Sequence, residues 1–409
     1  MSSQLERSGR WPAIAFEQVP WVSKYEQGAA SRNELRRHHG PYEAAIPATI
    51  AHSVAHLPAA LSAAVDEAAV EIARFDEQLG SQVAPFAAIL LRSEAAASSQ
   101  IENITASARA IAEAELAGGK GAGNAAQVVA NTRAMSAAIE LSADLSADAI
   151  LSMHDALLRP HNPDIAGRWR TEQVWIGGGR LGPHQAQFVP PQHSRVSEAM
   201  DDLLAFIDRD DMPAMVQAAI AHAQFETIHP FAEGNGRTGR ALIHALLRAK
   251  GLTRNVTAPV SAGLLVDVDA YFGALGVYRS GDPEAMVARL ADATFAAVAN
   301  GRMLVEELRE IRLSWDDRIK ARRGANVWRI ADLLLAHPVV DSGVIASSLG
   351  IATSNVYAPL EPLLAAGVLT HTNDRRRGQI WRSNEVLVAL DAFAARAGKR
   401  GAPSARVAQ

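Results

Sequence analysis

Residues 229–240 read HPFAEGNGRTGR, a stretch that places acid–base, metal-binding and phosphate-binding side chains close together. The imidazole of His229 titrates near neutral pH and can accept the proton of an attacking hydroxyl. Glu233 supplies a hard carboxylate oxygen, and Mg²⁺ binds readily to one such group while phosphates and waters complete its shell. Arg237 and Arg240 are three residues apart, so both guanidinium groups can reach neighbouring phosphates from one helix face. These residue types indicate phosphoryl or nucleotidyl transfer.

Two helices must hold this stretch. In the preceding AHAQFETI, apolar residues recur at helical spacing, which predicts a helix that ends near His229. Gly234, Asn235 and Gly236 are expected to break that helix and to take positive φ values that turn successive N–H groups toward one point. Residues 238–249 are predicted to form the next helix. A phosphate at its N-terminus is favoured by unpaired N–H groups and by the helix dipole.

The stretch resembles the HPFx[D/E]GNGRxxR motif of the Fic family, whose members mostly transfer AMP from ATP to a protein hydroxyl. Every fixed position is present. The resemblance implies a mainly α, Fic-type helical core in which His229 is the general base and Glu233 holds Mg²⁺. It also implies that ATP contacts Gly234, Asn235, Gly236, Arg237, Thr238, Gly239 and Arg240. Gly236 favours AMP transfer, because the phosphorylating Doc branch of the family has Lys there.

His222, Glu226 and His229 fall on one face of the first helix, as metal ligands would. Their spacing is not that of HExxH. His and Glu at such offsets more often make a helix-face hydrogen bond or pack against neighbours. We therefore assign no metal to this set.

Upstream, residues 98–103 read SSQIEN within an Ala-rich segment of strong helix propensity. They are similar to the [S/T]xxxE[G/N] inhibitory motif that many Fic proteins carry, which makes Ser98, Glu102 and Asn103 the candidate inhibitory residues. The resemblance implies that Glu102 pairs with Arg240 and so competes with a γ-phosphate for the same donors. In some relatives this glutamate also positions water to remove AMP from the modified target.

Residues 167–192 resemble the family's flap. Val174, Trp175 and Ile176 form one β-rich run and residues 187–189, with Phe188 at their centre, form another, so a hairpin with a glycine-rich loop is expected. An extended target segment docking on its open edge would bring a Ser, Thr or Tyr hydroxyl near His229. The alternative is a hairpin that only covers the core.

Aromatic residues mark a later core helix at DAYFGALGVYRSGD. Tyr271, Phe272 and Tyr278 are explained by core packing, and neighbouring positions line the adenine pocket in the family. Tyr271 is our candidate for that pocket.

The chain has 409 residues, 48% of them hydrophobic, and no cysteine, so it can build cores and cannot form disulfides. The segment MSSQLERSGR lacks the apolar centre of a signal peptide, and no run is long enough to span a membrane. We expect a cytoplasmic protein that does not insert in membranes. A net charge of −4 says little about partners.

Prolines and glycines mark the expected boundaries between helices, loops and domains. We expect an extended run at 41–48, a helix over about 58–79, and Ala-rich helices up to about Leu141 with a glycine loop between them. The expected parts are an N-terminal helical region 1–90, an inhibitory helix segment 91–110, a Fic catalytic core 111–300, a linker helix 301–326, a winged-helix-like domain 327–395 and a disordered tail 396–409.

The C-terminal part has the layout of a winged helix–turn–helix, with a turn at Gly350 and a wing tip at Arg375, Arg376 and Arg377. Residues 320–409 contain twelve Lys and Arg against six Asp and Glu, a balance that suits nucleic acid. Pro359 and Pro362 fall in the recognition helix, where proline removes an N–H donor. DNA binding by residues 327–395 is therefore in doubt, and protein contacts are the alternative.

Two functions remain open. The first is an ATP- and Mg²⁺-dependent protein adenylyltransferase, autoinhibited through Glu102 and able to de-AMPylate its target. The second is a winged-helix regulator of transcription or protein interaction whose Fic core senses nucleotide. An intact His229 and Glu233 favour the first, because a nucleotide sensor needs no positioned base. The partners expected for it are a protein substrate with a hydroxyl side chain, the chain itself as a target of self-modification, and a second copy in a homodimer.

Overall fold

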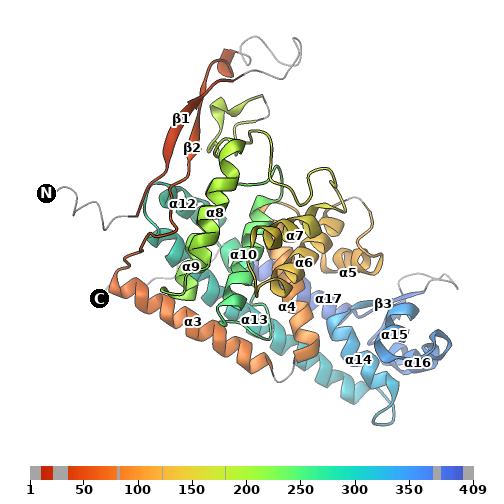
Figure 1. The fold of residues 1–409 in the computed structure, drawn as a ribbon. Coiled ribbons are helices and arrows are strands. Elements are labelled where there is room, and N and C mark those ends of the chain that lie inside the picture. Colours follow the sequence, from red (N-terminus) through yellow and green to blue (C-terminus); the bar gives the residue numbers. More distant parts are fainter. Residues whose placement is uncertain are drawn as a thin grey trace. The chain divides into compact units, whose positions relative to one another are not determined.

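The protein is described by a computed structural model in which a mainly helical chain carries small sheets, as the sequence predicts (Figure 1). The described residues are 11–21, 36–80, 83–121, 123–179, 181–371 and 379–398. They divide into two compact units. Unit 1 comprises 1–65, 137–249 and 269–289, and unit 2 comprises 66–136, 250–268 and 290–409.

Unit 1 contains a two-stranded ribbon and a group of helices. Strands β1 (Ala15–Val19) and β2 (Tyr42–Ile46) pair antiparallel, with Glu17 opposite Ala44. The helices are α7 (Ala147–Leu158), α8 (Val196–Ile207), α9 (Ala214–Ile228), α10 (Asn235–Ala249) and α12 (Val268–Arg279). Helix α9 is the centre: it packs against α8 and α10, and α10 also packs against α7. Every residue of α9 from Met215 to Ile228 is buried, as expected of a helix that is apolar nearly all round.

Unit 2 is built around α4 (Val83–Ile101), which packs against α11 (Val260–Leu265), against α14 (Asn326–Ala336) and against α17 (Asn384–Gly398). Its other helices are α5 (Ala108–Leu116) and α6 (Asn124–Glu140). Helices α3 (Ala59–Gly80) and α13 (Glu284–Arg318) lie mostly in this unit. The fully buried Glu94 of α4 accepts hydrogen bonds from the backbone N–H and the hydroxyl of Ser261, which fixes the start of α11.

The C-terminal elements have the predicted winged order. Helix α14 is followed by β3 (Val339–Asp341), α15 (Ser342–Leu349), a short 3₁₀ turn, α16 (Tyr357–Ala365), β4 (Thr370–His371) and β5 (Ile380–Arg382). The antiparallel sheet has the order β3-β5-β4. Gly350 ends α15 with φ +67°, as a C-terminal glycine commonly does.

The two prolines of the predicted recognition helix do not end it. Pro359 falls in the first turn of α16, where a missing N–H costs little, and Pro362 lies inside the helix. The predicted wing tip, Arg375 to Arg377, lies outside the described residues.

Several predicted boundaries differ from the structure. Helix α10 begins at Asn235, so Asn235 and Gly236 are helical, and of the three residues expected at positive φ only Gly234, at +79°, has it. The region 1–90 contains strands before its helices, and the extended run at 41–48 is confirmed as β2. The linker predicted at 301–326 is the second half of α13, which ends at Arg318. Residues 396–398 belong to α17, and 399–409 lie outside the described residues.

The flap is less regular than predicted. Within the described residues of the flap, one isolated antiparallel bridge, between Ile176 and Phe188, joins the two runs, and neither run forms a strand. Three successive glycines, Gly177 to Gly179, have φ between +76° and +88°. This backbone curves too tightly for a ladder to continue beyond the bridge.

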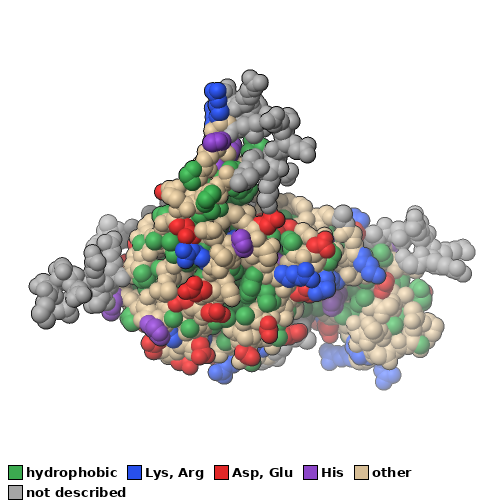
Figure 2. Space-filling model, turned by 45° about the horizontal axis from the view of Figure 1, so that its top comes forward, with side chains coloured by type: hydrophobic (Ala, Val, Ile, Leu, Met, Phe, Trp, Pro, Cys, Tyr) green, Lys and Arg blue, Asp and Glu red, His purple; other side chains and the backbone are tan. Residues whose placement is uncertain are grey.

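Acidic and basic side chains are interspersed over the described part of the face in Figure 2. That distribution agrees with the small net charge of −4. Among the helices that the structure describes, none combines the length and the apolarity that crossing a membrane requires.

Candidate active site

His229 lies at the turn that ends α9. It has left-handed φ and ψ of 51° and 61°, and its N–H donates to Phe225 O at 2.8 Å. A non-glycine residue in this region is uncommon and is held there by its surroundings. The sharp turn lifts the side chain out of the buried helix, so 18% of its surface remains exposed.

The imidazole of His229 is neutral. Burial lowers its pKa to about 3, and the nearby guanidinium groups of Arg170 and Arg279 contribute to the lowering. Nδ1 lies 3.7 Å from Glu226 Oε2, too far for a hydrogen bond. A neutral ring is the form that accepts a proton.

The loop after His229 is closed by Asn235. Its Oδ1 accepts from Phe231 N at 2.8 Å, and its Nδ2 donates to Phe231 O at 2.9 Å. Gly234 has no room for a side chain, because an added Cβ would lie 2.9 Å from Leu158 Cδ2. The first amides of α10 have no partner within the helix, and the loop brings them to the same end of the core as His229. A helix N-terminus of this kind suits an anion.

Arg170 braces the base of this loop. Its side chain is buried, and it donates to His229 O at 2.8 Å, to Glu172 O at 3.0 Å and to Pro191 O at 2.5 Å. Its own N–H donates to Pro230 O at 2.9 Å. Burial lowers its pKa to about 10, so it stays charged at neutral pH. One guanidinium therefore fixes both the His229 turn and the base of the flap.

His154 of α7 braces the other side. Nδ1 accepts from Gly167 N at 3.0 Å, so Nε2 carries the proton and donates to Glu233 O at 3.0 Å. The ring stacks on Phe231 with centroids 3.6 Å apart and planes 3° apart. Burial lowers the pKa of His154 to about 4, so the ring stays uncharged at neutral pH.

The predicted phosphate and metal residues lie together at the start of α10. The Glu233 side chain is 53% exposed, so its carboxylate is accessible to a metal, and it lies 3.8 Å from Arg237 Nη2. Arg237, Thr238 and Arg240 are all buried. Gly239 has a packing role, since an added Cβ would lie 2.7 Å from Glu226 Oε1 and 2.9 Å from Phe225. It lets α9 and α10 approach closely.

Tyr271 is buried in the core of unit 1. Its hydroxyl lies 2.7 Å from His222 Nε2, and the two rings stack. This bond gives His222 a partner of the kind expected for a packed helix face. Burial and the charge of Arg240 lower the pKa of His222 to about 3. Tyr271 as part of a base pocket stays a prediction, while its neighbour Phe272 is 52% exposed.

Both runs of the flap have contacts: the Trp175 ring packs edge-on against Trp21, with centroids 5.6 Å apart, and the Phe188 run makes backbone and cation–π contacts. Phe188 O accepts from Ile176 N at 2.8 Å, and Val189 O accepts from Ala45 N of β2 at 3.0 Å. The guanidinium of Arg279 lies 3.6 Å over the Phe188 ring. The Trp175 indole donates to Gly179 O at the exposed tip, and Val174 is partly buried.

The candidate inhibitory residues lie at the end of α4 in unit 2. Ser98 is fully buried, α4 ends at Ile101, and Glu102 and Asn103 form the turn that follows, so the predicted helix over 91–110 is interrupted. Asn103 has φ +61°, which explains why the motif takes Gly or Asn there. Glu102 and Arg240 belong to different units, and their pairing stays a prediction.

Sequence reasoning missed His154, Arg170 and Arg279. They hold backbone atoms or an aromatic face, and no local pattern distinguishes them from other buried polar residues. The one available signal was the density of glycine and aromatic residues around Gly167 and Trp169, which marks a tightly packed turn.

Residues 144–247 match the Fic/DOC family, and residues 62–140 match the Fic/DOC family N-terminal region. The chain is 31% identical over 158 residues to protein adenylyltransferase fic-1 of Caenorhabditis briggsae, which covers 38% of this chain and 28% of that protein. It is 32% identical over 116 residues to protein adenylyltransferase Fic of Nematostella vectensis, covering 28% and 25%. The matches thus span about a quarter of these relatives' length.

Among solved structures, a Fic family protein from Desulfovibrio desulfuricans G20 is similar with a TM-score of 0.51 and 25% identity, over 80% of this chain and 97% of that one. The similarity agrees with the mainly helical, Fic-like fold. Residues 144–247 thus match the Fic/DOC family and residues 62–140 match its N-terminal region, and over part of its length the chain is distantly similar to the Fic protein adenylyltransferases.

Proposed function

We propose that this protein is an adenylyltransferase that transfers AMP from ATP to a Ser, Thr or Tyr hydroxyl of a protein. The observation that carries the proposal is the position of His229 at a fixed turn, followed in the same loop by Glu233 and by a helix N-terminus that carries Arg237 and Arg240. The relatives named protein adenylyltransferases support it.

In this reaction the hydroxyl oxygen attacks the α-phosphorus of ATP, the bond to the β-phosphate oxygen breaks, and pyrophosphate leaves. The hydroxyl proton passes to a ring nitrogen of His229, which is neutral and able to receive it. The amides at the start of α10, with Arg237 and Arg240, would bind the phosphates and hold them in line. Arg170 keeps the His229 turn from shifting, which matters because an error of about 1 Å in geometry costs orders of magnitude in rate.

Glu233 fits the role of a Mg²⁺ ligand, because it is a largely exposed carboxylate beside the proposed phosphate site. When bound there, Mg²⁺ would neutralise charge on the phosphate oxygens.

The flap would present the target. Its 187–189 run is bonded to Ile176 on one side and to Ala45 on the other. The 174–176 run, which carries Trp175, is therefore the side on which an extended target segment would dock by strand addition. Glu102 would restrain the reaction by pairing with Arg240 in place of the γ-phosphate.

The test uses the purified full chain with α-labelled ATP and Mg²⁺, alone and with lysate. Wild type is expected to label weakly and Glu102→Gly strongly, while Glu102→Gly with His229→Ala does not label. The matched control is Glu102→Gly with His161→Ala, which removes an exposed histidine of unit 1 and is expected to label like Glu102→Gly. Circular dichroism and thermal melts verify that each variant folds.

The winged order of the C-terminal elements supports the regulatory alternative. Absence of labelling in every folded variant, together with salt-dependent binding of a DNA duplex, would replace the transferase proposal with that alternative. Mass spectrometry of labelled targets distinguishes an adenylyl adduct from a phosphoryl group by its mass.

A further inference from the structure

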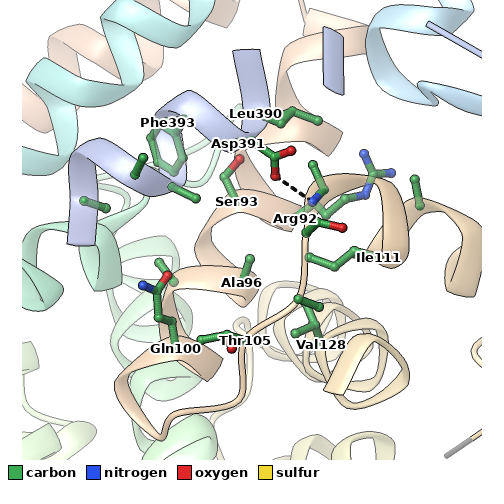
Figure 3. Close-up of a pocket in the computed structure, with 18 of the residues that line it drawn as sticks. Arg92, Ser93, Ala96, Gln100, Thr105, Ile111, Val128, Leu390, Asp391 and Phe393 are labelled. Carbon is green, nitrogen blue, oxygen red and sulfur yellow. Dashed lines mark hydrogen bonds between the residues drawn. The ribbon is translucent and has the colours of Figure 1, made fainter. Parts of the chain in front are cut away.

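Unit 2 contains a cavity of about 490 Å³ between α4, α5 and α17, which we name the α4–α17 cavity (Figure 3). Its walls come from Arg92 to Gln100 of α4, from the segment 104–107 and the start of α5, and from Leu390 to Ala397 of α17. This volume is typical of small-molecule sites. It exists because eight of its lining residues are alanines, whose short side chains leave the converging helices apart.

The lining is apolar over most of its area and polar at one end. Figure 3 shows Ile111, Val128 and Phe393 on different sides of the cavity, with Asp391 and Ser93 at its upper end. Several of its lining residues, Thr105 and Asp391 among them, are exposed, so the space is open to solvent and can admit an occupant. An occupant therefore needs an apolar body and one polar end.

Asp391 decides the charge of that polar end. Its Oδ1 accepts from Ala108 N at 2.8 Å, which fixes the carboxylate at the first turn of α5 (Figure 3). No group of the described residues donates a hydrogen bond to Oδ2, so Oδ2 is available to a donor from a ligand. The other charged lining residue, Arg92, already pairs with Glu115 at 2.8 Å and donates to Ala336 O. The carboxylate is thus the charge that a ligand would meet.

We propose that the α4–α17 cavity binds a small organic amine, with its ammonium group on Asp391 and its aromatic or branched apolar body among the alanines, Ile111 and Phe393. Charge-assisted hydrogen bonds of this kind are about twice as strong as neutral ones, which sets the preference for an amine over an alcohol. An anionic ligand of the same shape is repelled by the Asp391 carboxylate and should bind more weakly than the amine.

The position of the cavity gives the amine a regulatory role, a step that rests on the proposed transferase function. Gln100 and Ile104 both line the cavity, and they lie on either side of Glu102 and Asn103 in the chain. The turn is held by hydrogen bonds from Asn103 N to Gln100 O at 2.9 Å and from Ile104 N to Ser99 O at 3.1 Å. A ligand that contacts Gln100 and Ile104 fixes the turn that carries Glu102.

Binding is tested first and without activity, by titration calorimetry and saturation-transfer NMR on the full chain. The probes are 2-phenylethylamine and, as its anionic counterpart, 3-phenylpropanoate. Wild type is expected to bind the amine saturably and the carboxylate at least tenfold more weakly. Asp391→Asn, which keeps an oxygen for Ala108 N, is expected to weaken the amine at least tenfold. Ala96→Leu, which fills the cavity, is expected to abolish binding.

The control Asp317→Asn removes an exposed carboxylate of α13 outside the cavity and is expected to bind like wild type. Failure of the amine to bind saturably overturns the site. Equal binding of both probes, or equal binding to Asp391→Asn and wild type, overturns the amine class. If Asp391→Asn does not fold, Ala96→Leu and the two-probe comparison decide the question.

Labelling with α-labelled ATP then tests regulation. Saturating 2-phenylethylamine is expected to change wild-type labelling by threefold or more and to leave Glu102→Gly unchanged. Bound amine with unchanged labelling of wild type, in a protein whose Glu102→Gly form is active, overturns the regulatory step. If the amine binds but no variant is labelled, the transferase proposal is wrong, while the proposal of an amine site remains supported.

Discussion

The motif loop, residues 229–240, and the flap, residues 174–189, are built in opposite ways. The loop is braced on every side by buried polar groups: Arg170 holds its backbone, His154 holds Glu233 O, and Asn235 closes it. The flap has one β-bridge and three glycines at positive φ, and most of its fixed contacts are at the Phe188 run. Under the proposed function, the chemistry that needs fixed atoms would use the more braced loop, and target docking would use the flap.

The largest expected effect on the motif loop comes from removing the Arg170 side chain. Arg170→Met should destabilise the protein by roughly 3–5 kcal/mol, because at least three partly or fully buried carbonyls lose a charged donor. Chemical denaturation measures the loss. Labelling by the Glu102→Gly form should fall as well, since the His229 turn is no longer fixed. Arg168→Met, two residues away and exposed, is the control and should cost less than about 0.5 kcal/mol. Equal effects of the two substitutions would show that the brace is not needed.

A glycine pair compares the two regions directly. Gly234 and Gly179 both have positive φ, +79° and +88°, so alanine is strained at either position. At Gly234 the new Cβ also meets Leu157 and Leu158 at 3.0 and 2.9 Å, whereas at Gly179 it meets nothing within 4 Å. Gly234→Ala should cost roughly 2–4 kcal/mol and Gly179→Ala roughly 1 kcal/mol. Thermal and urea unfolding of both variants gives the difference, and a larger cost at Gly179 would reverse the contrast.

Acid should weaken the motif loop through its buried histidines. The folded pKa of His154 is about 4, below the usual 6.5, so the unfolded chain binds more protons between these values. Stability is therefore fully present above pH 6.5 and is lost as the pH falls toward 4, by roughly 1.4 kcal/mol per pH unit for this histidine. His222 and His229, with pKa values of about 3, add to the same trend.

His154→Asn isolates one part of that trend. Unfolding free energies measured from pH 7 to pH 4.5 should fall less steeply for this variant, by roughly 1.4 kcal/mol per pH unit, whatever its stability at neutral pH. His161→Asn, at an exposed position, should keep the wild-type slope. An unchanged slope for His154→Asn would mean that this ring takes up its proton over the same pH range in the folded protein as in the unfolded chain.

The sequence marks the candidate chemical residues of the loop but not the groups that support them. His229 and Glu233 were singled out because the roles proposed for them depend on residue type and spacing. The supporting groups bond to backbone carbonyls that are distant in sequence, as Arg170 does to His229 O. Such contacts do not depend on the identity of the carbonyl's residue, so no sequence pattern predicts them. The start of α10 was placed three residues late because Gly234 and Gly236 were treated alike, although only Gly234 leaves the helical region. The pairing of β1 with β2 joins residues from Val19 and Tyr42 to Ala15 and Ile46, 23 to 31 positions apart in sequence, beyond any local signal.

The smallest effect concerns how the flap is attached. Arg279 lies 3.6 Å over the Phe188 ring and also donates to Glu226 O at 3.3 Å in the last turn of α9. A double-mutant cycle with Phe188→Leu and Arg279→Met should give a coupling free energy of roughly 0.5–2 kcal/mol, as expected for a desolvated cation–π pair. Urea unfolding of the four proteins provides the measurement.

Arg309 and Phe86 serve as the comparison cycle, because the guanidinium there lies 5.8 Å from the ring centroid instead of 3.6 Å. Attraction to the ring face weakens with distance, so this pair should couple by less than about 0.5 kcal/mol. If the Phe188 cycle gives no more coupling than the Phe86 cycle, then Arg279 does not attach the flap. The backbone bonds of Val189 and Ile176, with the packing of Trp175 on Trp21, would then hold the flap.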